Sequence, residues 1–319
     1  MVESKQQWKA WLYLAPAMVL LLVFTVWPII NTVFMSLMEG YSGLAKAGGE
    51  ATFKFGVGNF TRVVAHPNFK QALKNTMLLC VLTVPISTIL ALLIAVALNS
   101  IKPLQKGLQT IFFLPYVTNS IAIGMVFAAM FNIIGNIGTR REVISSYGII
   151  NDLIRFISGN SDPKNYVNWI NVNSEYWANM FVMVVYIVWN ALPFKILVLL
   201  GGLQSINKQY YDAAKVDSTP RWRVLTRITV PLLSPMLAYV VITGFIGGFK
   251  EYTSIVGIFG ENMGPAHAPD RMNTVVGLIY DSLESNHQGE ASAAALILFG
   301  IILVVTMINL WVSKKNTHY

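Results

Sequence analysis

Long stretches without any charged side chain dominate this chain. Six such runs occur, each near or above the ~20 residues that a helix needs to cross a bilayer. They are Ala10–Met38, Asn75–Ile101, Gly107–Thr139, Tyr176–Phe194, Ile228–Phe249 and Ala291–Ser313. The pattern predicts an all-α integral membrane protein in which residues 1–319 form one transmembrane domain with six helices, at about 10–38, 72–100, 108–132, 176–200, 232–258 and 291–313.

The composition agrees with a membrane protein. The chain has 319 residues, of which 55% are hydrophobic and 12% charged, and its mean hydropathy is +0.55. A soluble domain carries about 25% charged residues, roughly twice as many. The lone cysteine, Cys80, lies in an apolar run, so a disulfide framework is excluded and we interpret it as a small buried hydrophobic residue. The histidines show no ligand spacing, and no metal or other cofactor is expected.

The basic residues predict the orientation of the spans. An even number of spans places both termini on one side, and loops rich in Lys and Arg stay in the cytoplasm. With cytoplasmic N- and C-termini, the inner segments hold the basic excess while acidic residues outnumber basic ones outside. The net charge of +8 therefore reflects the inner face rather than nucleic-acid binding. The first span is too long for a signal peptide and lacks a small-x-small cleavage site.

The polar segment 207–231, between the fourth and fifth spans, is the longest one that also has a regular pattern. Asn207 is a good N-cap residue, and Tyr210, Ala213, Ala214 and Asp217 then share one side of a helix. Ser218-Thr219-Pro220 predicts a stop and a restart, because proline disfavours helix before it but suits the first turn of a new helix. We expect a short amphipathic helix followed by a bend.

A second short helix is expected after the bend. Trp222, Leu225 and Ile228 would point inward, three Arg residues would point outward, and Pro231 would end the helix. Two basic helices at a bend suggest a docking element, although a pair of membrane-surface helices would give the same pattern. A DNA-binding helix-turn-helix is disfavoured, because the flanking spans leave no room for a domain around it.

This segment resembles the EAA loop of the membrane subunits of bacterial ABC importers. The family pattern appears here as Asp212-Ala213-Ala214, Asp217-Ser218-Thr219, Trp222 and Ile228-Thr229-Val230-Pro231. The chain departs from the pattern with Asp instead of Glu at 212 and Ser instead of Gly at 218. The second departure matters more, because Gly permits a positive φ at the bend. We interpret it as a variant bend with the function retained.

Weaker similarities to the same family occur in the right order around this loop. They are Pro16 or Pro28 in the first span, Asn75-Thr76, Phe113-Leu114-Pro115-Tyr116, Gly148-Ile149-Ile150-Asn151, Gly201-Gly202-Leu203-Gln204-Ser205-Ile206, and Gly264-Pro265 with Thr274 and Tyr280. The resemblance thus covers nearly the whole chain. It is closest to the carbohydrate branch, like the first permease of maltose- and multiple-sugar-type systems, and implies a multi-pass protein of the bacterial cytoplasmic membrane.

The resemblance implies partners and a coupling site. It implies a heterodimer with a second permease, two cytoplasmic ATP-binding cassette subunits and an extracytoplasmic sugar-binding protein. The EAA loop would form a cytoplasmic coupling helix seated in a cleft of the ATPase. The residues expected to make this contact are Tyr210, Tyr211, Asp212, Ala213, Ala214, Asp217, Ser218, Arg221, Trp222 and Arg227.

The sequence contains no motif for chemistry of its own. It has no G-x-x-x-x-G-K-[ST] stretch, no G-x-S-x-G and no paired carboxylates, so the chain is not expected to be an enzyme, and energy would have to come through a partner. An ion-coupled secondary sugar carrier is the main alternative. It is disfavoured because Glu251 is the only intramembrane carboxylate. A scaffold without transport would not need an EAA loop.

Candidate residues for the translocation pathway lie in the fourth and fifth spans. Aromatic rings stack on sugar rings, and nearby polar groups bind the hydroxyls. The candidates are Tyr186, Trp189 and Asn190 in the fourth span and Lys250, Glu251 and Tyr252 after the glycine-rich segment Gly244–Gly248, which we expect to allow close helix contact. Lys250 and Glu251 are expected either to pair beside the cavity or to extend to the outer interface.

The longest outer loop, from about Asn132 to Ser174, has two interpretations. It is rich in asparagine and too short for an independent domain, but long enough for small helices over the outer mouth. It is either a solvated connector or a surface that touches an external binding protein.

Overall fold

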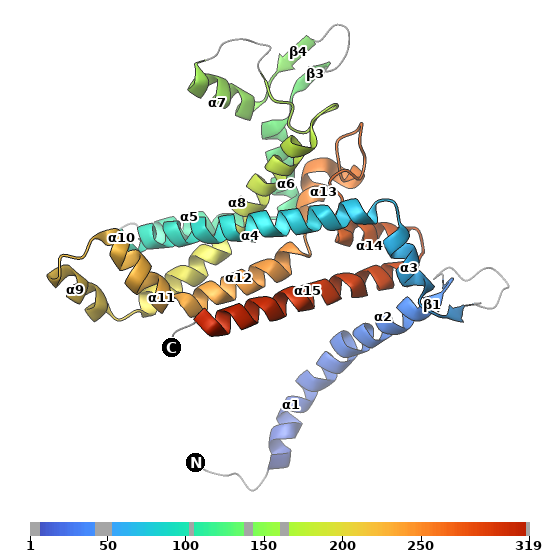
Figure 1. Cartoon of the computed structure of the whole chain (residues 1–319), viewed down its shortest axis with the longest axis horizontal. Coiled ribbons are helices and arrows are strands. Elements are labelled where there is room, and N and C mark those ends of the chain that lie inside the picture. Colours follow the sequence, from blue (N-terminus) through green and yellow to red (C-terminus); the bar gives the residue numbers. More distant parts are fainter. Residues whose placement is uncertain (1–6, 42–52, 102–104, 137–142, 160–165, 317–319) are drawn as a thin grey trace. The chain divides into compact units, whose positions relative to one another are not determined.

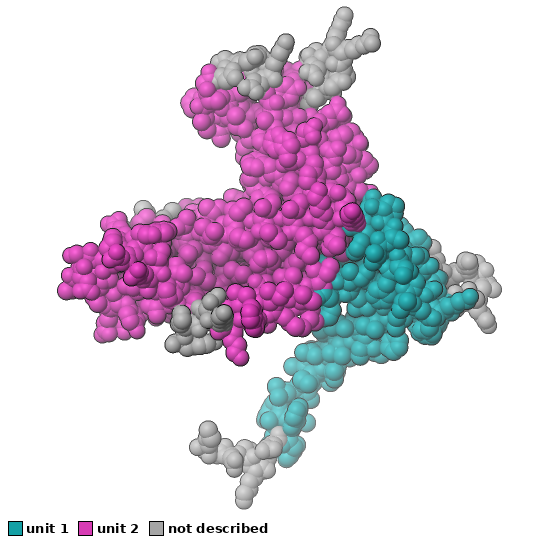
Figure 2. Space-filling view, viewed as in Figure 1, with its two compact units in different colours: residues 1–69, 278–300 teal, residues 70–277, 301–319 magenta. Residues whose placement is uncertain are grey.

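The computed structural model describes residues 7–41, 53–101, 105–136, 143–159 and 166–316. These residues form two compact units, shown in different colours in Figure 2. Unit 1 comprises residues 1–69 and 278–300, and unit 2 comprises residues 70–277 and 301–319.

Unit 1 begins with the first predicted span. Residues Trp8–Leu37 form one long apolar helix, in which a π-helical turn, Leu22–Val26, ends two residues before Pro28. Proline has no N–H for the bond to the carbonyl four residues earlier, and a π turn is one way in which a helix accommodates this. The elements are α1 (Gln7–Leu21), η1 (Leu22–Val26), α2 (Trp27–Leu37), β1 (Met38–Glu39), β2 (Lys54–Phe55) and α3 (Gly58–Ala65).

Polar side chains hold the end of α2 against α3. The buried amide of Asn59 donates to the carbonyls of Ser36 and Met38, at 2.9 and 3.0 Å. Glu39 accepts from the backbone N–H of Gly58, at the start of α3. Arg62 pairs with Glu290 at 3.0 Å, which joins α3 to the start of α15 (Gln288–Asn316). These contacts fix the turn that follows the first span.

Unit 2 contains the long helices around which the remaining elements pack (Figure 1). Helix α4 (Phe69–Ser100) and helix α8 (Tyr176–Ser205) run through it, and both are apolar enough to cross a bilayer. The other elements are α5 (Gln105–Val117), α6 (Ser120–Phe131), β3 (Ile134–Asn136), β4 (Val143–Ser146), α7 (Ile149–Ser158), α9 (Lys208–Val216), α10 (Arg221–Val224), η2 (Leu225–Thr229), α11 (Val230–Leu232), α12 (Ser234–Gly248), α13 (Thr253–Phe259) and η3 (Gly260–Asn262). Helix α14 (Val275–Glu284) begins in unit 2 and continues into unit 1.

The helices agree with four of the six predicted spans and modify the other two. Among the described residues, four helices are long and apolar enough to span a membrane: Trp8–Leu37, α4, α8 and Gln288–Lys314. The third predicted span is instead two helices, α5 and α6, separated at Asn119, whose side chain accepts from the N–H groups of Ile121 and Ala122 and so starts a new helix.

The fifth predicted span is also broken. Its helix bends by 71° between Arg221–Leu232 and Ser234–Gly248, and α12 ends at Gly248 rather than at residue 258. The bend occurs at Leu233, between Pro231 and Pro235. Because neither proline can donate a backbone hydrogen bond, this stretch is the weakest point of the helix. Counting the bent pair as one span gives up to five spans.

The Asn75-Thr76 pair clamps a distant loop onto α4. Asn75 donates to the carbonyls of Arg271 and Asn273, at 2.9 and 2.8 Å, and accepts from the hydroxyl of Tyr176. Thr76 accepts from the N–H of Val275 at 3.1 Å. Both side chains are buried. The motif therefore supplies hydrogen bonds to a loop whose backbone would otherwise be unpaired in an apolar interior.

Helices α6 and α13 pack with their backbones in direct contact. A methyl group on Gly124 of α6 would lie 2.7 Å from the Cα atom of Gly257 in α13, so neither position has room for a side chain. The surrounding core includes Leu79, Phe131, Met183 and Ile255. Close approach through small residues is the usual way in which helices associate in membranes.

Candidate functional site: a docking loop and a buried cavity

The first helix of the loop, α9, starts as the sequence predicts. Asn207 caps it, because its side-chain oxygen accepts from the backbone N–H of Gln209 at 3.0 Å. A capping side chain satisfies one of the donors that lack a partner in the first turn.

The end of α9 explains the Ser218 position. The N–H of Thr219 donates to the carbonyl of Ala214 at 2.9 Å, and the N–H of Ser218 donates to the carbonyl of Lys215 at 3.1 Å. These two bonds form a Schellman motif, in which the first residue after the helix cap adopts the left-handed conformation. Ser218 has φ of 51° and occupies that position. The chain thus adopts the glycine conformation with a serine, which confirms the predicted bend.

The helix α9 presents two different sides, whereas the sequence predicted one packed side. Ala214 is 5% exposed, and the hydroxyl of the half-buried Tyr211 lies 3.3 Å from the Oγ1 atom of Thr229. Tyr210, Ala213 and Val216 are exposed. Of the predicted group, Ala214 therefore packs on the chain itself, while Tyr210 and Ala213 are exposed.

Trp222 also differs from the prediction. It is 71% exposed instead of pointing inward. The helix continues through a π turn, Leu225–Thr229, and ends at Leu232, so Pro231 does not end it. An extra residue in a helical turn shifts the side chains that follow. The buried side of this helix consequently runs through Leu225 to the buried Thr229 rather than through the regular spacing from Trp222.

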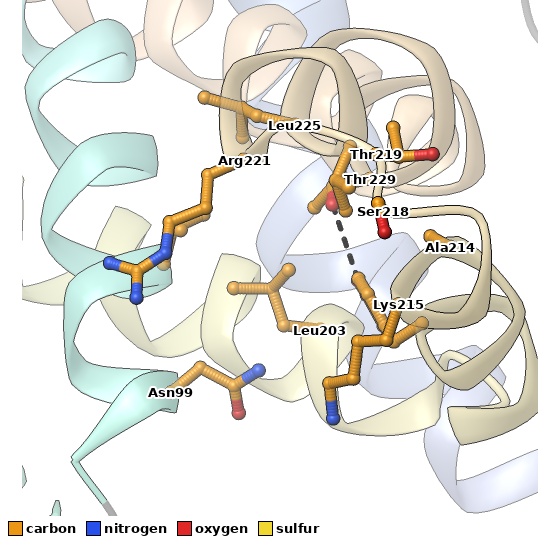
Figure 3. Close-up of a pocket in the computed structure, with 12 residues that line it drawn as sticks. Asn99, Leu203, Ala214, Lys215, Ser218, Thr219, Arg221, Leu225 and Thr229 are labelled. Carbon is orange, nitrogen blue, oxygen red and sulfur yellow. Dashed lines mark hydrogen bonds between the residues drawn. The ribbon is translucent and has the colours of Figure 1, made fainter.

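A cavity of about 630 Å³ lies beneath the loop, and Figure 3 shows the side chains around it. Lys215 and Arg221 of the loop point toward it, while Asn99 from the end of α4 and Leu203 from the end of α8 form its other side (Figure 3). The loop thus shares this cavity with the ends of two long apolar helices, α4 and α8.

We call Tyr210, Ala213, Val216 and Trp222 the outer side of the loop. All four are exposed in the chain, and they are apolar or aromatic. Arg223 and Arg227 are exposed as well, whereas Asp212 pairs with Lys215 at 3.4 Å. Aromatic and Arg side chains are enriched at protein–protein contacts. The arrangement suits docking to another protein.

A second cavity, of about 300 Å³, lies among α4, α5, α8 and α12. Its most unusual feature is Lys195, which is only 4% exposed although it lies within an apolar helix. The ammonium donates to the carbonyl of Val84 at 3.2 Å and to the hydroxyls of Ser87 and Thr88, at 2.7 and 2.9 Å. All three partners are neutral groups on α4. The charge therefore joins α8 to α4 and has no carboxylate partner among the described residues.

The glycines of α12 form one wall of this cavity. A methyl group on Gly244 would lie 3.1 Å from Val84 Cγ1 and 3.2 Å from Lys195 Nζ, and one on Gly248 would lie 3.0 Å from Cys80 Sγ. The small residues thus permit the close contact with α4 and α8 that the Gly244–Gly248 pattern predicts. Cys80 is fully buried, as expected from its apolar surroundings.

The six predicted pathway residues do not all reach this cavity. Asn190 and Glu251 line it. Tyr186 is fully buried beside it and bonds to Ser120, while the half-buried Trp189 packs against Phe127 with ring centres 5.2 Å apart.

Lys250 and Tyr252 lie outside the set that lines the cavity. Lys250 is exposed and makes no ion pair with Glu251, so the predicted pairing is wrong. Glu251 instead accepts from the N–H of Ser254 at 3.3 Å, near the start of α13. Tyr252 is the residue immediately before α13. Helix α12 ends at Gly248, so the side chains of Lys250, Glu251 and Tyr252 no longer follow helical spacing and point in different directions.

The sequence interpretation missed Lys195. It was visible as the only charged residue within the fourth apolar stretch, and an ionisable group inside a membrane helix is itself a signal for function. Its hydrogen-bond partners were not visible, because they lie more than a hundred residues earlier in the chain.

The comparisons with known proteins agree on one family of transport proteins. The family model described as "Binding-protein-dependent transport system inner membrane component" matches residues 83–318. The chain is 29% identical over 300 residues to the lactose transport system permease protein LacF of Rhizobium radiobacter, covering 94% of this chain and 91% of that protein. It is 29% identical to the arabinooligosaccharides transport system permease protein AraP of Bacillus subtilis, covering 95% and 88%.

A solved structure with the same fold is a chain of a bacterial ABC transporter involved in the import of the acidic polysaccharide alginate. The two chains superpose with a TM-score of 0.75 at 20% identity, over 98% of each. At this identity the similarity establishes the fold.

Proposed function

We propose that this chain, which belongs to the family of binding-protein-dependent transport system inner membrane components, is the membrane-spanning permease subunit of an ATP-driven importer. It would form a heterodimer with a second permease, receive its solute from an extracytoplasmic binding protein, and take energy from two cytoplasmic ATP-binding cassette subunits. The solute would be a sugar or an oligosaccharide.

The observation that carries this proposal is the loop from Asn207 to Pro231. It holds an apolar outer side away from the chain and shares a cavity with the ends of α4 and α8. A transporter without a nucleotide-binding motif of its own needs a contact of this kind. Closure of the ATPase subunits would displace the loop, and the two long helices would move with it.

The cavity beside Lys195, among α4, α5, α8 and α12, supports a sugar as the solute. Tyr116 and Phe194 stack with ring centres 5.9 Å apart, and Asn190 and Glu251 place polar groups at the same cavity. Aromatic faces and hydroxyl-binding groups together suit a carbohydrate. The lactose and arabinooligosaccharide permeases, which match nearly the whole chain, point in the same direction.

Reconstitution tests the proposal against an ion-coupled carrier. The permease, its partner permease, the ATPase subunits and the binding protein are placed in liposomes, and uptake of labelled lactose and of arabinose oligosaccharides is measured. We expect uptake to require ATP on the ATPase side and to survive ionophores that collapse proton and sodium gradients. Uptake that is abolished by ionophores and does not need ATP would establish the carrier instead. Mass spectrometry of solute bound to the purified complex then identifies the sugar.

A further inference from the structure

The short helix α7 (Ile149–Ser158) has an apolar side that is exposed in the described part of the structure. Ile149, Leu153, Phe156 and Ile157 fall on the same side of the helix at the helical spacing. Phe156 is 85% exposed and Ile157 is 75% exposed. Figure 1 shows α7 next to β3 and β4, beyond the ends of α6 and α8.

The opposite side of α7 faces the protein and is polar. Asn151 is buried, donates to the carbonyls of Tyr147 and Val167, and accepts from the N–H of Val167 and from Nε1 of Trp169. Arg155 lies 3.8 Å from Asp152 and stands over the ring of Tyr147. This arrangement is the reverse of a helix on a soluble protein, where the apolar side packs inward. The protein holds α7 through Asn151 and through Ile150, which packs against the core, and turns the side with Phe156 and Ile157 away.

Aromatic contacts place α7 at the level where α8 begins. Trp169, which donates to Asn151, packs its ring 5.9 Å from that of Trp177. Trp177 lies in the first turn of the span Tyr176–Ser205 and is 56% exposed. Tyr147 and Tyr166 form a further ring pair, 5.3 Å apart, beside the helix. Trp and Tyr concentrate where membrane helices cross from the apolar layer into the headgroups.

From these contacts we propose that α7 lies on the membrane surface with Leu153, Phe156 and Ile157 inserted among the lipid acyl chains. The polar side of α7 is linked, through Asn151 and the buried Trp169, to the exposed Trp177 in the first turn of a helix that is apolar enough to cross the bilayer. The charges of α7 are paired with each other, so electrostatics does not favour a protein partner. Amphipathic helices of this kind lie in the interface with the apolar side buried at the headgroup boundary.

The test uses a nitroxide spin label on the full chain, reconstituted into vesicles of phosphatidylethanolamine and phosphatidylglycerol. Single cysteines replace Phe156 or Ile157, and the matched control replaces Ser158, which is adjacent but lies on another side of the helix. The background is Cys80→Ser. If that background folds poorly, the native chain serves, because Cys80 is fully buried and beyond the reach of a water-soluble label. Collision rates with oxygen and with a water-soluble nickel complex are measured at each site.

Insertion predicts high oxygen and low nickel access at Phe156→Cys and Ile157→Cys, and a several-fold lower ratio of oxygen to nickel collisions at Ser158→Cys. High access to both reagents at Phe156→Cys would show a helix in water and overturn the proposal. Low access to both, with an immobilised label, would show a protein surface such as a binding protein or a second permease covering the helix, and would overturn it as well. The measurement does not depend on transport, so its failure is distinguishable from a failure of the proposed function.

Discussion

The loop from Asn207 to Pro231 and the cavity beside Lys195 place apolar and charged groups in opposite environments. In the loop, the apolar side chains of Val216 and Trp222 are exposed, and backbone hydrogen bonds form at the bend around Ser218. The cavity hides a full charge: Lys195 is surrounded by neutral acceptors deep in the helices. Exposed apolar surface is stable only when a partner covers it, and a buried charge is stable only when hydrogen bonds surround it. The difference shows that the loop leaves apolar surface exposed in this chain, whereas Lys195 finds its hydrogen bonds within the chain.

Substitutions at two adjacent alanines should give the largest effect and test whether the two sides of α9 have different roles. Ala214 packs on the chain and Ala213 faces outward. We expect Ala214→Glu to displace α9 from its seat at a cost of about 3 kcal/mol, because a buried carboxylate needs a partner. Ala213→Glu should leave α9 in place and weaken only the docking of the ATPase subunit.

Limited trypsin digestion at Lys208 and Lys215 reports the seating of α9, and co-purification reports the docking. Faster cleavage of Ala214→Glu with wild-type cleavage of Ala213→Glu is the expected pair of results. Equal protection of both variants would remove the distinction between the two sides of the helix.

Substitution of Trp222 tests whether the exposed side of the loop binds another protein. Because its ring is exposed in the chain, Trp222→Ala should not change the thermal unfolding of the permease alone. Its effect should appear in affinity for the ATPase, with a loss of about 2–3 kcal/mol, as for other aromatic hot spots. A binding titration of the two variants with the purified ATPase measures it. Unchanged affinity with lowered thermal stability would mean that Trp222 packs on the permease after all.

The contact between α6 and α13 should lose stability when a single methyl group is added. Gly124→Ala places a methyl group against the backbone of Gly257, and we expect a loss of about 2 kcal/mol of stability from overpacking. Gly247→Ala is the matched control, since no atom lies within 4 Å of the added methyl group. Thermal unfolding in detergent separates them. A Gly124 variant as stable as the control would show that α6 and α13 can move apart without cost.

The smallest effect concerns the bend itself. Ser218 holds a left-handed conformation that costs a residue with a side chain about 1 kcal/mol relative to glycine. Ser218→Gly should therefore slow hydrogen exchange at the end of α9 slightly, while Ser218→Val should speed it. Faster exchange in Ser218→Gly would mean that the serine side chain contributes a contact beyond the backbone geometry.

The loop was predictable from the sequence because its information is local. The Asn207 cap, the bend at Ser218 and the helix after Pro220 follow from residues that are close neighbours, and the structure confirms each of them. The exposed position of Trp222 was not predictable, because a π turn that no short pattern indicates replaces the regular helical spacing assumed for Trp222, Leu225 and Ile228.

The cavity depends on partners far apart in the sequence. The hydrogen bonds of Lys195 join positions separated by more than a hundred residues, and the backbone contact of Gly124 with Gly257 spans a similar distance. Hydropathy identified most of the helices that bring these groups together. It does not show which sides of those helices meet, nor where a helix such as α5–α6 breaks, because both are set by packing between distant segments.

The most direct test of the central claim is a photo-crosslink from the loop. A benzophenone amino acid replaces Trp222 in the full chain expressed with its importer partners, and another replaces Phe156 of α7 as a control remote in sequence. After irradiation of intact membranes, mass spectrometry identifies the attached protein. The account predicts that position 222 attaches to a subunit carrying a G-x-x-x-x-G-K-[ST] motif and that position 156 does not. Attachment of the ATPase at 156 with none at 222, or a crosslink from 222 to lipid alone, would contradict the assignment of this loop as the site of energy coupling.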